Sequence, residues 1–209
     1  MSKSQQRKRD LLSAATHVIG AHGISGANIR AVAEQAGIST GSVLYHFESF
    51  DKLVIEAVKN VLDEFSTRRR QLIDGIADPR ERLRRMITSG IPELISDDLR
   101  VIYEVAAVLR DKPEYRASMT LLAERQVGLY QVVIEVGVAL GAFRPRGDVE
   151  GIATNLVALE DGYGLYLLDP DNWQRERYLA NLIQYAQIAL DCDLSTNDET
   201  PSDTDEEPQ

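Results

Sequence analysis

Near the N-terminus two apolar stripes of helical spacing are separated by a glycine, and this feature limits the folds open to the chain. Over residues 11–22 apolar side chains recur every three or four positions, which is the period of one helix face, and Gly23 can end that helix in the left-handed conformation. A second stripe covers residues 29–36 and stops at Gly37. The sequence therefore predicts two short helices that bury one side each.

A third, very short helix is predicted directly after Gly37. Asn28 and Ser39 are plausible N-caps of the second and third helices, and Val43 and Phe47 have the spacing of a buried face. Two helices separated by a tight glycine turn form a helix-turn-helix, so this is the motif that we predict for the N-terminal segment.

The outer faces of the third helix carry small and hydrogen-bonding groups. If Val43 and Phe47 face the core, then the outward residues are Thr40, Ser42, Tyr45 and His46. Gly41 lets the start of this helix approach another surface closely, while hydroxyl and ring groups can meet phosphates and base edges. Arg30, near the start of the preceding helix, can join them. The alternative is a plain helical hairpin with a polar outer surface.

The net charge of the chain does not exclude a nucleic-acid partner. The formal charge is −10 over 209 residues, but acids within residues 191–207 contribute −8 with no base among them. Residues 1–47 carry a local balance of +3. A basic N-terminal segment is thus hidden by an acidic C-terminal one.

The remainder of the chain is predicted to be helical, which makes the fold class all-α. A helix starts at Ser49 or Asp51, another starts at Asp78, and further helices are expected at about 97–111, 113–141, 148–168 and 172–191. Residues 193–209 are predicted to be an acidic, disordered tail, because the stretch "STNDETPSDTDEEPQ" has no apolar side chain.

Several classes of protein and site are disfavoured by what the chain contains. Cys192 is the single cysteine, which rules out an intrachain disulfide and a cysteine-based zinc site and suits a cytoplasmic location. The longest apolar run, residues 152–168, is interrupted by charges and glycines and is short for a bilayer, so no membrane segment is predicted. The three histidines lack metal-ligand spacing and neighbouring carboxylates diverge on a helix, so we expect no metal, no cofactor and no catalysis.

Two predicted helices are apolar almost all round and must be covered by other helices, a partner chain or a ligand. In "RVIYEVAAVLR" Glu104 is the one charge between the flanking arginines, and in "IATNLVALEDGYGLYLL" the charges are Glu160 and Asp161. Acids beside aromatic rings suit a cationic ligand. The candidate ligand-binding residues are Tyr103, Glu104, Glu160, Tyr163 and Tyr166, with Phe65 and Met86 as apolar lining.

Alternatives to this cationic site stay open at this point. The acids can instead pair with Arg100, Arg125 or a tyrosine hydroxyl, or line a dimer seam. Tyr103, Tyr163 and Trp173 can be core aromatics, and an apolar cavity can take a neutral effector.

The stretch "RKRDLLSAATHVIGAHGISGANIRAVAEQAGISTGSVLYHFESFDKLVIEAV" resembles the N-terminal DNA-binding domain of the TetR family of bacterial transcriptional regulators. The segments "LLSAATHVIGAHG", "IRAVAEQAGIS" and the closing "HF" match the family pattern in order and spacing. Two positions depart from it: Leu44 stands where an aromatic is common, and Phe50 stands where a lysine is frequent, with Lys52 as its possible substitute. The resemblance implies that the third helix enters the major groove. The predicted DNA-binding residues are Asn28, Arg30, Ser39, Thr40, Gly41, Ser42, Tyr45, His46 and Lys52.

The resemblance also implies a dimer formed by the last two helices and a ligand pocket in the same domain. We therefore predict a helix-turn-helix domain over residues 1–49 and a ligand-binding and dimerisation domain over residues 50–192. The predicted function is a homodimeric transcriptional regulator, most often a repressor in this family, that binds a palindromic double-stranded DNA operator. A small-molecule effector would release it. The competing hypothesis is a helical small-molecule carrier or interaction protein without DNA function.

Overall fold

The computed structural model describes residues 3–169, 171 and 173–195, and the regular structure of these residues is helical. The elements are α1 (Lys3–Gly26), α2 (Ile29–Gln35), α3 (Thr40–His46), α4 (Phe50–Ile73), α5 (Pro79–Gly90), α6 (Asp97–Leu109), α7 (Pro113–Ala139), α8 (Val149–Gly164), the 3-10 helix η1 (Leu165–Leu168) and α9 (Arg175–Leu190). The all-α prediction is confirmed. The part of the predicted tail after residue 195 lies outside the described residues.

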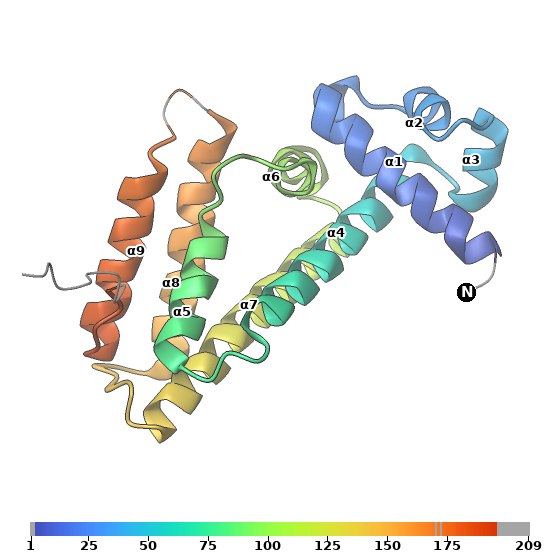
Figure 1. Ribbon diagram of the computed structural model, residues 1–209. Coiled ribbons are helices and arrows are strands. Elements are labelled where there is room, and N and C mark those ends of the chain that lie inside the picture. Colours follow the sequence, from blue (N-terminus) through green and yellow to red (C-terminus); the bar gives the residue numbers. More distant parts are fainter. Residues whose placement is uncertain (1–2, 170, 172, 196–209) are drawn as a thin grey trace, which may run out of the picture.

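Figure 1 shows α1 to α3 gathered at one end of an elongated molecule and α5, α8 and α9 at the other. The long helices α4 and α7 pack against each other and connect the two ends. Helix α6 lies between the two ends of the molecule and packs on α1. This arrangement makes α6, together with the first half of α4, the contact between the N-terminal unit and the rest of the chain.

Local sequence signals start the short helices as predicted. The Asn28 side-chain oxygen accepts a hydrogen bond from the backbone N–H of Ala31 at 3.0 Å, and the Ser39 hydroxyl accepts one from Ser42 N–H at 3.2 Å. Between the two helices Gly37 has a φ of +65°, a conformation that favours glycine. These caps satisfy N–H groups that a helix start leaves without an internal partner.

The N-terminal unit shares its hydrophobic core with α6. Leu11, Ile19, Val43 and Phe47 are buried in one cluster with Val101, Val105 and Leu109 of α6. The same cluster takes in the first half of α4. The packing of this unit therefore extends beyond the predicted boundary at residue 49, because three helices alone cannot cover their own apolar faces.

Two local expectations are refined by the structure. Gly23 has the expected positive φ of 68° and interrupts the helix there, but a second helical stretch follows directly and runs to Gly26, so α1 is kinked at Gly23. Leu194, inside the predicted tail, is 3% exposed and packs in the second core cluster, while its N–H donates to the side-chain oxygen of Gln187. The packed chain thus extends past residue 193, since one apolar side chain finds a place in the core.

Candidate functional site

The outer surface of α3 presents the predicted group of small and aromatic residues. Val43 is fully buried, and this fixes the rotation of the helix so that Thr40, Gly41, Ser42 and Tyr45 are exposed. Tyr45 is 86% exposed, and its ring meets the His46 ring edge-on with 5.3 Å between centroids. Tyrosine is enriched at interfaces because its ring is apolar and its hydroxyl can form hydrogen bonds, so this exposed ring is available for contact with a partner.

A hollow of about 420 Å³ runs along this surface and brings in a basic residue from α1. Its lining residues are Arg7, Ile38, Ser39, Gly41, Ser42, Tyr45 and His46. Arg7 was not among the predicted site residues, although its place in a basic run was the signal that could have identified it. The hollow combines a cation with hydroxyl and ring groups, which suits a phosphate beside a base edge.

Three of the predicted contact residues are already engaged inside the protein. The oxygens of Asn28 and Ser39 cap α2 and α3, so they hold the helices in place. The Lys52 ammonium donates to both carboxylate oxygens of Glu114 in α7, at 2.7 and 3.0 Å. The Glu114 carboxylate raises the pKa of Lys52, mainly through these hydrogen bonds and also through its charge.

Arg30, by contrast, is exposed near the start of α2.

A second candidate site is a cavity of about 340 Å³ enclosed by α4 to α8 and η1. It is lined by Phe65, Arg69, Ser89, Gly90, Pro92, Leu99, Ile102, Tyr103, Ala106, Met119, Leu122, Ala123, Gln126, Val157, Glu160, Asp161, Gly162, Gly164, Leu165 and Leu167. Most of these side chains are apolar, with a few polar groups between them. Such a lining is typical of small-molecule pockets.

The structure brings three of the predicted ligand-binding residues together and separates the other four. Phe65, Tyr103 and Glu160 line the cavity. Met86 is fully buried in the second core cluster, and Glu104 faces α1. Tyr163 and Tyr166 border a different surface hollow, where their rings stack with Tyr178 at centroid distances of 4.5 and 5.7 Å; Trp173 packs on the same ring. The idea of one site holding all seven residues is therefore corrected.

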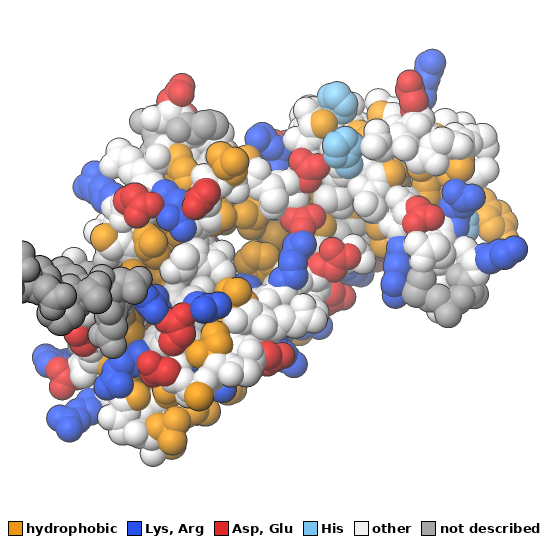
Figure 2. Space-filling model, in the orientation of Figure 1, with side chains coloured by type: hydrophobic (Ala, Val, Ile, Leu, Met, Phe, Trp, Pro, Cys, Tyr) orange, Lys and Arg blue, Asp and Glu red, His pale blue; other side chains and the backbone are white. Residues whose placement is uncertain are grey.

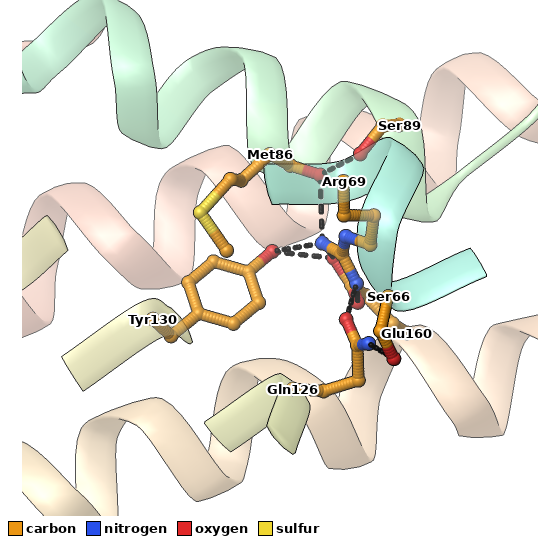
Figure 3. Close-up of polar contacts among 7 residues, drawn as sticks. All are labelled: Ser66, Arg69, Met86, Ser89, Gln126, Tyr130 and Glu160. Carbon is orange, nitrogen blue, oxygen red and sulfur yellow. Dashed lines mark hydrogen bonds and ion pairs between the residues drawn. The ribbon is translucent and has the colours of Figure 1, made fainter. Parts of the chain in front are cut away.

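Glu160 is neutralised by a partner that sequence reasoning missed. Arg69 of α4 donates to its two carboxylate oxygens, at 2.7 Å from Nη1 and 2.9 Å from Nη2, and the Tyr130 hydroxyl also donates to it (Figure 3). Arg69 and Glu160 are 4% and 5% exposed. Burial alone would lower the pKa of Arg69, but the adjacent Glu160 carboxylate more than offsets this and raises it. Of the partners named as alternatives, Arg100 pairs with Glu104 and a tyrosine hydroxyl, that of Tyr130, bonds to Glu160, whereas Arg125 pairs with Asp63.

The remaining hydrogen-bonding capacity of this buried pair is largely satisfied by its surroundings. Arg69 Nη2 donates to the Met86 carbonyl at 2.9 Å, and Nη1 donates to Gln126 Oε1 at 2.9 Å. Figure 3 shows these groups converging on the guanidinium. Such a network is rigid, because each charge would be costly to leave without its partner.

Within the described ranges no group of three or more histidine, cysteine, aspartate or glutamate side chains could hold a metal ion. Among the same residues, no helix is both long and apolar enough to span a bilayer. On the face shown in Figure 2, acidic and basic side chains are interspersed.

Comparison with known families gives two matches. Residues 11–57 match the profile of bacterial regulatory proteins of the tetR family. Residues 79–190, more than half of the chain, match the profile of the C-terminal part of BetI-type transcriptional repressors.

Individual relatives are similar over most of their length. The HTH-type transcriptional repressor KstR2 of Mycolicibacterium smegmatis is 28% identical over 151 residues, covering 71% of this chain and 73% of that protein. The HTH-type nicotine-responsive transcriptional repressor HdnoR of Paenarthrobacter nicotinovorans is 24% identical over 183 residues, covering 85% of this chain and 92% of that protein. Among solved structures, a transcriptional regulator from Saccharomonospora viridis in complex with choline superposes with a TM-score of 0.79 at 25% identity, over 89% of this chain and 98% of that one.

Proposed function

Because the chain belongs to the TetR family and is a ligand-responsive, DNA-binding transcriptional regulator, we propose that it is a repressor released by a small organic cation. Regulators of this family bind DNA operators as dimers and respond to small-molecule effectors. In this proposal α3 of each protomer enters the major groove of a palindromic operator, and the effector occupies the cavity enclosed by α4 to α8. The protein acts in the cytoplasm, where the operator lies, and catalyses no reaction.

The DNA-binding part of the proposal is carried by the exposed face of α3. Tyr45 and Thr40 project from a helix whose rotation is fixed by Val43, and Arg7 lies at the same hollow. Hydroxyl groups and the tyrosine ring can contact base edges, while Arg7 and Arg30 can contact phosphates. Dimerisation through α8 and α9 is supported by the exposed apolar side chains of Ile188 in α9 and of Leu165 in η1, which directly follows α8, at 60% and 61% exposure.

The test of DNA function is selection of bound fragments from genomic duplex DNA, with affinity measured over a range of salt concentrations. A repressor recovers a discrete palindromic operator, and its affinity falls steeply with salt. A helical carrier protein recovers no discrete sequence. Sedimentation of the free protein should show a dimer of about twice the 23.3 kDa chain mass.

The cationic class of effector is supported by the cavity and by two relatives. The cavity combines the Phe65 and Tyr103 rings with two carboxylates and one arginine. Aromatic faces and carboxylates both attract cations. HdnoR is described as nicotine-responsive, and the regulator from Saccharomonospora viridis was solved with choline. Release of the selected operator by choline or protonated nicotine, with no release by neutral lipophilic compounds of similar size, is the expected result.

A further inference from the structure

Two carboxylates stand side by side in the wall of the cavity, and one of them has no partner. Glu160 is held by two nitrogens of Arg69 and by the Tyr130 hydroxyl. Asp161, the next residue of α8, forms no hydrogen bond or ion pair with the part of the chain that the structure describes. The carboxylate of Asp161 is therefore available to pair with a ligand, whereas that of Glu160 is already occupied.

The charges of the lining leave a net negative charge at Asp161. Among the lining residues Arg69 is the one basic side chain, and Glu160 compensates it. Arg69 cannot turn toward Asp161 without abandoning buried bonds to Glu160 and to the Met86 carbonyl. A ligand carrying one positive charge would make the lining neutral.

A glycine close to Asp161 in α8 lets an aromatic side chain approach the helix closely. A side-chain carbon at Gly162 would meet no atom within 4 Å, whereas one at Gly164 would lie 1.8 Å from the Tyr103 hydroxyl oxygen. The absence of a side chain at Gly164 thus allows α6 to bring the Tyr103 ring against α8. Burial, and then the nearby Asp161 charge, raise the pKa of Tyr103, so its phenol stays neutral and its ring faces remain attractive to a cation.

We propose that Asp161, rather than Glu160, recognises the positive charge of the effector, with Tyr103 as the adjacent aromatic wall. The inference rests on the proposed function and specifies the residue that selects the ligand. The ligand class is a small organic monocation whose apolar body lies against Ile102, Met119 and Leu122, which line the same cavity. Asp161 itself is exposed, so it stands where the cavity opens to solvent and can meet an entering ligand first.

The experiment compares cations with a neutral molecule of the same shape. Choline, tetramethylammonium and protonated nicotine are titrated by calorimetry into the full-length protein, beside 3,3-dimethylbutan-1-ol, the neutral carbon analogue of choline. The proteins are wild type, Asp161→Asn, and Glu150→Gln as a control that removes an exposed acid from the same helix outside the cavity. Thermal unfolding of each variant without ligand checks that it is folded.

The expected result is tighter binding of at least one cation than of the neutral alcohol by wild type and Glu150→Gln. In Asp161→Asn, cation affinity should fall by about ten- to a hundredfold, because a charged hydrogen bond or ion pair is lost, while binding of the alcohol is unchanged. Equal cation affinity in Asp161→Asn and wild type overturns the assignment of Asp161 and leaves the cationic effector standing. If no cation binds the wild type better than the alcohol does, both the assignment of Asp161 and the proposal of a cationic effector are overturned.

Discussion

Glu104 of α6 accepts a hydrogen bond from the backbone N–H of Ile24 in α1, with 3.2 Å between oxygen and nitrogen. Ile24 directly follows Gly23, where α1 is kinked. Tyr103, the residue before Glu104, lines the cavity. Consecutive residues of one helix therefore contact the cavity and the N-terminal unit, so α6 connects the two directly.

Glu104→Ala should destabilise the protein by about 1 kcal/mol, because the Ile24 N–H loses its acceptor. The exchange of the Ile24 amide proton, measured by NMR, should become faster. Arg100→Ala is the matched control, since it removes the 3.3 Å ion pair to Glu104 and leaves the bond to Ile24 intact. If both variants lower the free energy of unfolding by the same amount, the ion pair and not the hydrogen bond to Ile24 accounts for the loss.

The buried pair gives a much larger expected effect. Arg69→Met leaves the Glu160 charge without its partner in a site that is 5% exposed, so the free energy of unfolding should fall by about 3 to 5 kcal/mol in urea titrations. The double change Arg69→Met with Glu160→Leu should recover most of that loss, because no unpaired charge remains. A loss below about 1 kcal/mol in the single variant would contradict a desolvated pair.

Two helical glycines should respond in opposite ways to alanine. At Gly90 a side-chain carbon would lie 2.0 Å from Glu160 Oε1, so Gly90→Ala should displace the carboxylate and destabilise the protein by several kcal/mol, in roughly the range of the broken pair. At Gly128 in α7 a side-chain carbon would meet no atom of another element within 4 Å. Gly128→Ala should therefore stabilise the protein by about 0.5 to 1 kcal/mol. Thermal and urea unfolding of both variants check the contrast.

Tyr45→Ala should lower operator affinity by roughly 1 to 3 kcal/mol if the tyrosine contacts a base. Its thermal stability should stay close to that of the wild type, because the side chain is 86% exposed. Leu94→Ala, at a position 83% exposed and outside the N-terminal unit, is the control for general surface effects. Unchanged operator affinity in Tyr45→Ala would remove Tyr45 from the DNA interface.

The pKa of Asp161 predicts a small dependence of stability on pH. The residue is exposed at the cavity, but the protein atoms around its carboxylate displace part of the water there, and this desolvation, with the Glu160 charge as a second cause, raises its pKa from 3.8 to about 6. The favourable protonated form is fully present below pH 3.8 and is lost as the pH rises through 6, so ionisation costs stability above that range. Asp161 is exposed and solvent screens the effect, so Asp161→Asn should gain no more than about 0.5 kcal/mol over wild type between pH 4 and 7. A gain already present at pH 3 would contradict this origin.

The short helices and the outward face of α3 could be predicted from the amino-acid sequence, because their causes are local. Asn28 and Ser39 cap neighbouring backbone groups three positions away, and Gly37 allows the turn between α2 and α3. The periodic positions Val43 and Phe47 fix which face of α3 points outward. Each of these relations spans a few residues, so spacing in the chain is a sufficient guide.

The polar lining of the cavity could be found from the packed structure alone, because the residues that interact there are far apart in the chain. Arg69 and Glu160 are separated by 91 positions, and Glu104 and Ile24 by 80. The apolar stripe of α4, which places Arg69 four residues after Phe65, hints that this arginine points inward but says nothing of the carboxylate it meets. Adjacent acids such as Glu160 and Asp161 look equivalent in sequence. Packing of α4, α7 and α8 neutralises the first and leaves the second open, because ion pairing depends on distances in space and not on spacing along the chain.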